Sequence, residues 1–163
     1  MPAPTPLVTT LREGIVTALA AVTAGSTYHN TLTGTDQVKK GIYATPPRKA
    51  LPCVMVGRAA LTNEHGEPLG SYRRTAVFTM VCWAPATSAD PEERLTAAEK
   101  LAQDVAVCIE TAINAPTGSL FSSCISGKVD AVDFEGAEGD VAGWATALLT
   151  FSIVYESRSG AGL

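Results

Sequence analysis

This sequence has few of the residues that carry out chemistry. Of its 163 residues only two are histidines, His29 and His65, and aromatic residues make up 6% of the chain. Charged residues make up 17%, and no apolar run reaches the roughly 18 residues of a membrane span. The net charge of −4 lacks the basic excess typical of nucleic-acid-binding proteins. We therefore expect neither a membrane protein nor a protein that binds nucleic acid specifically.

The four cysteines, Cys53, Cys82, Cys108 and Cys124, are widely spaced and include no CxxC pair. The first three lie in apolar stretches, as expected of small buried side chains. A zinc site would need closer ligand spacing, and a disulfide framework would need a secretion signal, which the N-terminus lacks. We expect four free thiols and no metal or other cofactor.

Hydrophobic residues make up 46% of the chain, and its length suits one domain covering residues 1–163. Hydrophobic periodicity predicts helices at 7–24 and 91–114, and strands at 51–59, 71–83, about 126–134 and 144–157. Residues 26–50 are polar and rich in Thr and Gly, which indicates a long loop or arm, and residues 158–163 are expected to form a loose tail. The order α-β-β-α-β-β predicts an α+β fold: a four-stranded, mainly antiparallel sheet with two helices on one face.

Residues 81–94 form the junction between the second strand and the second helix. In α/β enzymes ligands usually bind at such a junction, but here the residues needed for binding or catalysis are missing. It contains neither a GxSxG nucleophile motif nor glycines that could hold a phosphate. Asp90 and Pro91 instead suit the first turn of a helix. On the outer side of that helix we expect an ion pair between Lys100 and Asp104. No catalytic residue is predicted, and the protein is not expected to be an enzyme.

Other polar clusters leave two interpretations open. The histidines lie in turn-like segments that favour solvated loop positions over a catalytic or metal site. The acidic segment 133–140 fits a hydrated hairpin tip, with a weak cation site as the alternative. Arg73 and Arg74 in a strand, and basic residues at 39–40 and 48–49, are either solvated edges or contacts for an acidic surface or the DNA backbone.

Two tryptophans indicate an interface. If two helices cover one sheet face, Trp83 and Trp144 share the other face with Val77, Val81, Leu148 and Val154. An apolar patch of this kind is typical of a contact surface, and tryptophan is favoured at interface centres. We predict interface contacts from Arg73, Arg74, Trp83 and Trp144.

The chain resembles the tail terminator (tail completion) proteins of long-tailed bacteriophages. The resemblance lies in the layout of residues 7–157: an N-terminal amphipathic helix, an arm ending "GIYATPPRKALPCVMVG", the strand "YRRTAVFTMVCWAP", the helix from Pro91 and the final strand "ALLTFSIVYES". It implies a structural protein of the virion that forms a homohexameric ring on the last layer of the tail tube and stops its growth. Its partners would be the tail tube protein and the head-side connector or neck protein, with DNA passing through the hole without specific binding. Such a protein would lie at the head-proximal end of the tail, and in the host cytoplasm during assembly.

Two other classes of protein remain open from the residues alone. One is another neck or head-completion ring of a phage. The other is a small α+β domain that binds a ligand. A pocket lined by His29 or His65 would favour this second class.

Overall fold

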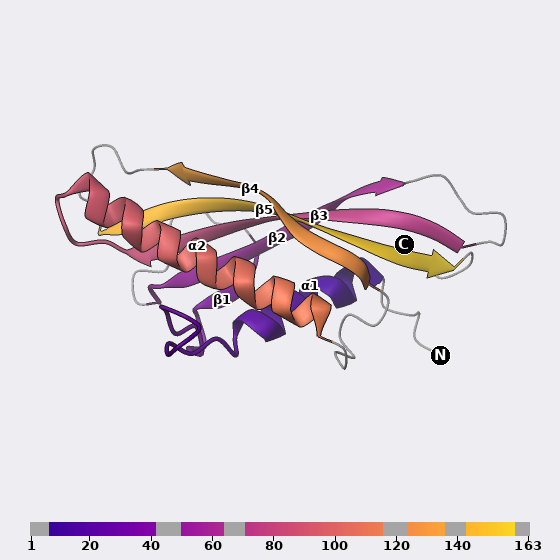
Figure 1. Cartoon of the computed structure of the whole chain (residues 1–163), viewed down its shortest axis with the longest axis horizontal. Coiled ribbons are helices and arrows are strands. Elements are labelled where there is room, and N and C mark those ends of the chain that lie inside the picture. Colours follow the sequence, from indigo (N-terminus) through magenta and orange to yellow (C-terminus); the bar gives the residue numbers. More distant parts are fainter. Residues whose placement is uncertain (1–6, 42–49, 64–70, 116–123, 136–142, 159–163) are drawn as a thin grey trace.

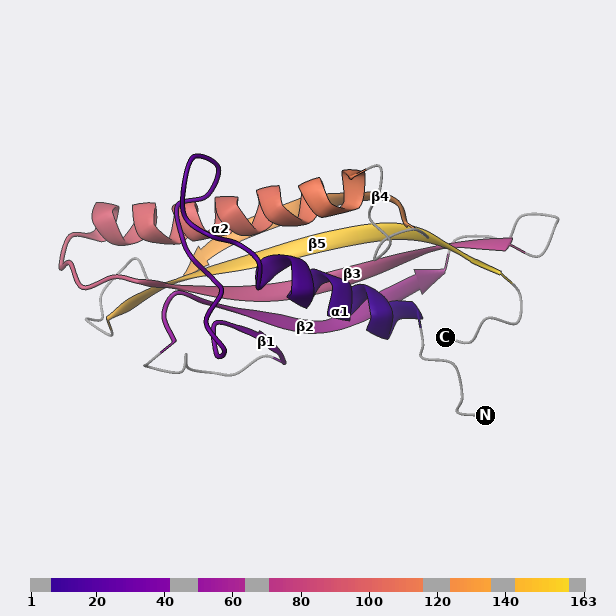
Figure 2. The ribbon, with the colours of Figure 1, turned by 90° about the horizontal axis from the view of Figure 1, so that it is seen from below.

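The computed structural model describes residues 7–41, 50–63, 71–115, 124–135 and 143–158. The elements in chain order are α1 (Leu7–Leu19), β1 (Val38–Lys40), β2 (Cys53–Asn63), β3 (Ser71–Pro85), α2 (Pro91–Asn114), β4 (Cys124–Glu135) and β5 (Trp144–Arg158). The strands form one twisted layer, and both helices pack on the same face of it (Figures 1 and 2).

The sheet has five strands in the order β1-β2-β3-β5-β4, so the prediction of a four-stranded sheet with the order α-β-β-α-β-β was wrong. The extra strand, β1, lies inside the predicted arm 26–50 and pairs parallel to β2, which makes the sheet mixed. Backbone bonds hold it there, from Val54 N to Gln37 O (2.7 Å) and from Gly41 N to Val56 O (2.9 Å). A strand of three residues is too short to show an alternating pattern, so its sequence gave no signal.

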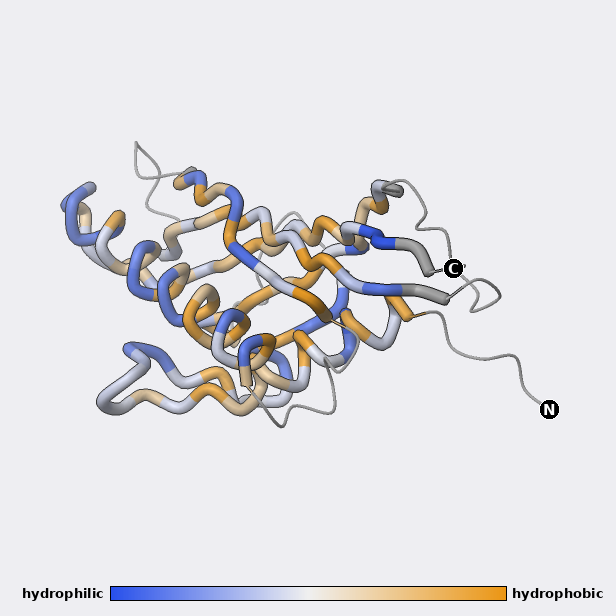
Figure 3. The backbone as a smooth tube through the Cα atoms, turned by 45° about the vertical axis from the view of Figure 1, so that its right-hand side comes forward, coloured by the Kyte–Doolittle hydropathy of each residue, from blue (hydrophilic) through white to orange (hydrophobic). Residues whose placement is uncertain are grey.

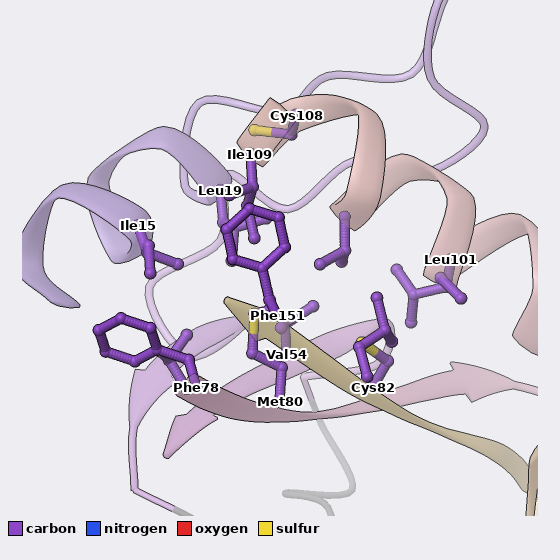
Figure 4. Close-up of a cluster of buried hydrophobic side chains, with 14 of the residues drawn as sticks. Ile15, Leu19, Val54, Phe78, Met80, Cys82, Leu101, Cys108, Ile109 and Phe151 are labelled. Carbon is purple, nitrogen blue, oxygen red and sulfur yellow. The ribbon is translucent and has the colours of Figure 1, made fainter. Parts of the chain in front are cut away.

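The two longest strands form the centre of the sheet. β3 and β5 pair antiparallel along their whole length, from Ser71 opposite Arg158 to Pro85 opposite Trp144. Their alternating residues separate into a face covered by the helices and a helix-free face. The main core lies between the sheet and the helices and includes Ile15, Leu19, Val54, Phe78, Met80, Cys82, Leu101, Cys108, Ile109 and Phe151 (Figure 4).

Helix α2 begins and ends as predicted, at Pro91 and Asn114. The Asp90 side chain caps it by accepting a hydrogen bond from Glu92 N at 3.0 Å. This helix is amphipathic, with hydrophilic turns on its outer side (Figure 3).

Helix α1 ends at Leu19, five residues before the predicted end at residue 24. After Leu19 the backbone hydrogen bonds join residues three apart instead of four apart, such as Val22 N to Leu19 O at 3.1 Å. Val22 and Leu32 nevertheless belong to the core and are joined by a bond from Leu32 N to Val22 O of 2.9 Å. The apolar spacing predicted burial correctly, but it did not predict where helical geometry stops.

Candidate interaction surfaces

A second apolar cluster lies on the helix-free face. We call it the Trp83 cluster; it consists of buried Cys53, Met55, Val81 and Trp83, with Leu51, Trp144 and Leu148 packed against them. Strand register explains the grouping, because Cys53 lies opposite Trp83 and Met55 lies opposite Val81. Trp83 is only 3% exposed, so it serves the fold of the subunit itself.

Trp144 lies at the margin of this cluster and is partly exposed. It is the first residue of β5 and lies opposite Pro85, the last residue of β3. Its carbonyl oxygen accepts a hydrogen bond from Nη2 of the buried Arg94 at 3.2 Å, which ties the start of β5 to the first turns of α2. Both tryptophans thus lie on the helix-free face, and only Trp144 is accessible for contact. Their role in an interface stays a prediction.

Arg73 and Arg74 lie far from the tryptophans. Ten residues along β3 separate Arg73 from Trp83, which corresponds to about 33 Å. Arg73 is exposed and opposite Glu156, whereas Arg74 is opposite Tyr155, a residue of the main core, and so lies on the helix side. Burial raises the pKa of the Tyr155 phenol, and the positive charge of Arg74 and a hydrogen bond with it partly oppose this effect. The four residues predicted for the interface therefore occupy two ends of the sheet and, in the case of Arg74, the other face.

An open cleft of about 420 Å³ lies between the chain at 29–30 and the first half of α2. Its polar and charged lining consists of His29, Asn30, Glu92, Glu93, Thr96 and Lys100. The mixed charges in its walls could receive a small polar molecule. His29 therefore does line a pocket, as a ligand-binding domain would require, whereas His65 falls outside the described residues.

A buried carboxylate positions this wall of the cleft. Asp104 on α2 is 1% exposed and accepts hydrogen bonds from His29 N (2.9 and 3.0 Å), Asn30 N (2.7 Å) and Asn30 Nδ2 (2.9 Å). The predicted ion pair between Asp104 and Lys100 on the outer side of the helix was wrong. Helical spacing alone allowed that pair, but the segment that covers Asp104 comes from 74 residues earlier in the chain.

The remaining polar clusters do not converge. Lys39 and Lys40 pair with Asp36 (2.6 Å) and Glu13 (3.0 Å). Residues 48–49 and 136–140 fall outside the described residues, so the basic pair and most of the acidic segment 133–140 are not placed. Within the described residues, no group of three or more His, Cys, Asp or Glu side chains could hold a metal ion.

All four cysteines are free thiols, three buried and Cys124 partly exposed. Burial raises the pKa of Cys53, Cys108 and Cys124 to about 11 and also raises that of Cys82. A raised pKa leaves about 100-fold less reactive thiolate near pH 8 than an ordinary thiol has. We expect slow labelling of the native protein by a thiol reagent, with Cys124 reacting first.

Counting the modified thiols over time by mass spectrometry measures this directly. Replacing Cys124 with Ser should remove the earliest phase, and all four parent thiols should react at once in denaturant. Rapid labelling of Cys53 or Cys82 in the native protein would contradict the burial described here.

None of the described helices is both long and apolar enough to cross a membrane.

Comparison with known proteins gives a structural likeness to a virion component. No protein-family model matches the sequence, and no curated protein matches it either. Among solved structures, a chain of the virion of a native gene transfer agent (GTA) particle superposes with a TM-score of 0.58. The superposition covers 94% of this chain and 100% of that chain, at 14% sequence identity. Identity this low shows a shared fold, and the fold is one that a virion component uses.

Proposed function

We propose that this protein is a structural component of a virion that forms a homohexameric ring, caps the tail tube, ends its polymerisation and joins the tail to the head-side connector. Two separate findings support a virion component. The layout of residues 7–157 resembles that of tail terminators, and the fold superposes on a chain of a gene transfer agent virion over 94% of this chain. The superposition carries the proposal, because it covers both chains almost completely rather than one shared motif.

The layout of the subunit suits a role in assembly. A ring needs two unlike contact surfaces on each subunit, because neighbours meet head to tail. The helix-free face offers one such surface, with Trp144 partly exposed beside the Trp83 cluster at one end and the exposed Arg73 at the other. In this proposal DNA passes through the ring without specific binding, which the net charge of −4 permits.

The contact surface can be tested with Trp144. We expect that Trp144→Ala leaves the subunit folded but weakens the contact between neighbouring subunits and, with it, binding of the ring to tail tubes, because the side chain is partly exposed and packs at the margin of its cluster. The measurement is co-sedimentation with tubes of the cognate tail tube protein, next to circular dichroism of the free protein.

Leu61→Ser is a matched control, because Leu61 is 40% exposed but lies opposite the core residue Ala76 and so on the helix side of the sheet. Normal co-sedimentation of the Trp144 variant, with a native spectrum, would remove this tryptophan from the interface. Loss of binding by both variants would point to a general effect of apolar surface.

A small ligand-binding domain is the second candidate, and the cleft lined by His29 and Lys100 favours it. A ligand that binds only the folded state raises the melting temperature, and the rise grows with the ratio of ligand concentration to its dissociation constant. Screening small anionic and zwitterionic metabolites by thermal shift therefore tests this candidate. A hit that is lost in Lys100→Ala would support the ligand-binding domain over the ring.

A further inference from the structure

β4 is an unusually open edge of the sheet. The strand order leaves β1 and β4 at the two edges, with lengths of three and 12 residues. In the described part of the chain the exposed large hydrophobic side chains are Leu61, Ile125, Val132 and Phe134, and the last three belong to β4. A long edge strand with exposed apolar side chains is a template for pairing with another strand.

The first half of β4 is partly covered by α2. A Cβ atom on Gly127 would lie 2.5 Å from Cδ1 of Ile113, so the helix lies directly against the strand there. The Glu110 side chain accepts a long hydrogen bond of 3.5 Å from Val129 N. Residues 130–134 are all exposed, so the second half of the strand is open.

An irregularity in β4 controls which side chains share a side. The register to β5 shifts between Val129 and Ala131, so Asp130 is an inserted residue. Lys128 and Asp133 lie opposite Ser152 and Leu148, both on the helix-free face. Without the inserted residue, an even and an odd position could not lie on the same side of a strand.

Val129 and Val132 lie on the other side of β4. They are opposite Phe151 and Leu149, which are core residues under the helices. The helix-free side of β4 therefore carries the charged pair Lys128 and Asp133, and its helix side carries the apolar pair Val129 and Val132. Both pairs are symmetric about the point between Asp130 and Ala131.

We propose that β4 pairs antiparallel with β4 of a second copy of this chain, about a two-fold axis between Asp130 and Ala131. In this register Lys128 of each copy lies opposite Asp133 of the partner subunit, and Val129 lies opposite Val132 of the partner subunit. In this register the helix side of one β4 continues into the helix side of the partner's β4, and the two helix-free sides also adjoin. The pairing therefore buries apolar surface on the helix side and forms two opposite-charge pairs on the helix-free side. Shifting the register by two residues in one direction places Lys128 opposite Ala131 and loses both charge pairs. Shifting it in the other direction places Lys128 opposite Glu135 but also sets the like charges of Asp130 and Asp133 opposite each other.

The groups needed for this pairing are available. Within the subunit Lys128 contacts only Asp130 among acidic partners in the described residues, at 3.4 Å, and its side chain is 77% exposed. Such an exposed pair exchanges readily for another. The Glu110 bond to Val129 N is long enough to yield to a backbone partner.

This contact goes beyond the ring. A two-fold pairing closes on itself with two copies, so it cannot generate a ring, and it leaves the helix-free face unoccupied. We expect the free protein to be a dimer when no tail tubes are present.

The test is a charge exchange across the axis. Lys128→Asp and Asp133→Lys each place two like-charge pairs in the contact and should weaken dimerisation about tenfold or more, measured by sedimentation equilibrium. The double variant restores opposite charges in reversed order and should regain the dimer. Lys100→Asp, on α2, is the control with the same charge change away from β4.

Hydrogen exchange identifies the surface. Amides of residues 131–134 should become protected as protein concentration rises, and the melting temperature should show that each single variant stays folded. A monomeric parent, or a dimer that both single variants retain, would overturn the proposal. Failure of the double variant to regain the dimer would also overturn the register. Neither result bears on tail capping, which is measured with tubes.

Discussion

Replacing Trp83 with alanine should destabilise the subunit by about 4 kcal/mol. Trp83 is 3% exposed and packs with Cys53, Met55 and Val81 on the helix-free face. Truncation removes apolar contact area and leaves a cavity among the side chains of the cluster, which the paired strands beneath cannot fill by moving together. The melting temperature should fall by roughly 10 °C for a domain of this size.

Trp144→Ala is the matched control, since it has the same chemical change on the same face at a partly exposed position. Its melting temperature should fall much less. Thermal unfolding followed by circular dichroism compares the two variants. Equal, small losses would mean that the Trp83 cluster contributes little to the fold and that Trp83 is accessible after all.

Replacing Asp104 with alanine should cost about 3 kcal/mol, because four hydrogen bonds to one buried carboxylate disappear together. The backbone N–H groups of His29 and Asn30 would lose their acceptor, and water could satisfy them only if the segment moved away from α2. We expect the chain around His29 to loosen while the sheet remains intact.

Hydrogen exchange at residues 29–30 measures this change, and Gln103→Ala is the control, because Gln103 is the exposed neighbour of Asp104 on the same helix. Protection at 29–30 should be lost in the Asp104 variant and kept in the control. Unchanged protection and stability would show that the carboxylate does not hold the segment.

Long, strongly patterned elements were predictable from the sequence. Helix α2 has a capping Asp90, a proline at its first position and a regular apolar stripe, and its bounds agree with the prediction. The last strand alternates over its whole length because one face packs under helices and the other does not. The same alternation placed Trp83, Trp144, Val81 and Leu148 on one face, but it did not predict that Cys53 and Met55 of β2 would complete the cluster.

Features that depend on distant partners were not predictable. β1 is defined by its bonds to β2 and not by its own three residues. Asp104 looked like an exposed helical residue because the backbone groups that bury it lie 74 residues earlier. Arg74 was grouped with Arg73 because they are adjacent, although successive residues of a strand point to opposite faces.

The most direct test of the central claim is electron microscopy of tail tubes assembled with and without this protein. If it caps the tube, tubes grown in its presence should be bounded in length, and each should carry one ring of six subunits at one end. Tubes grown without it should continue to lengthen. Tubes of equal length in both samples, with no ring at either end, would contradict the proposed function.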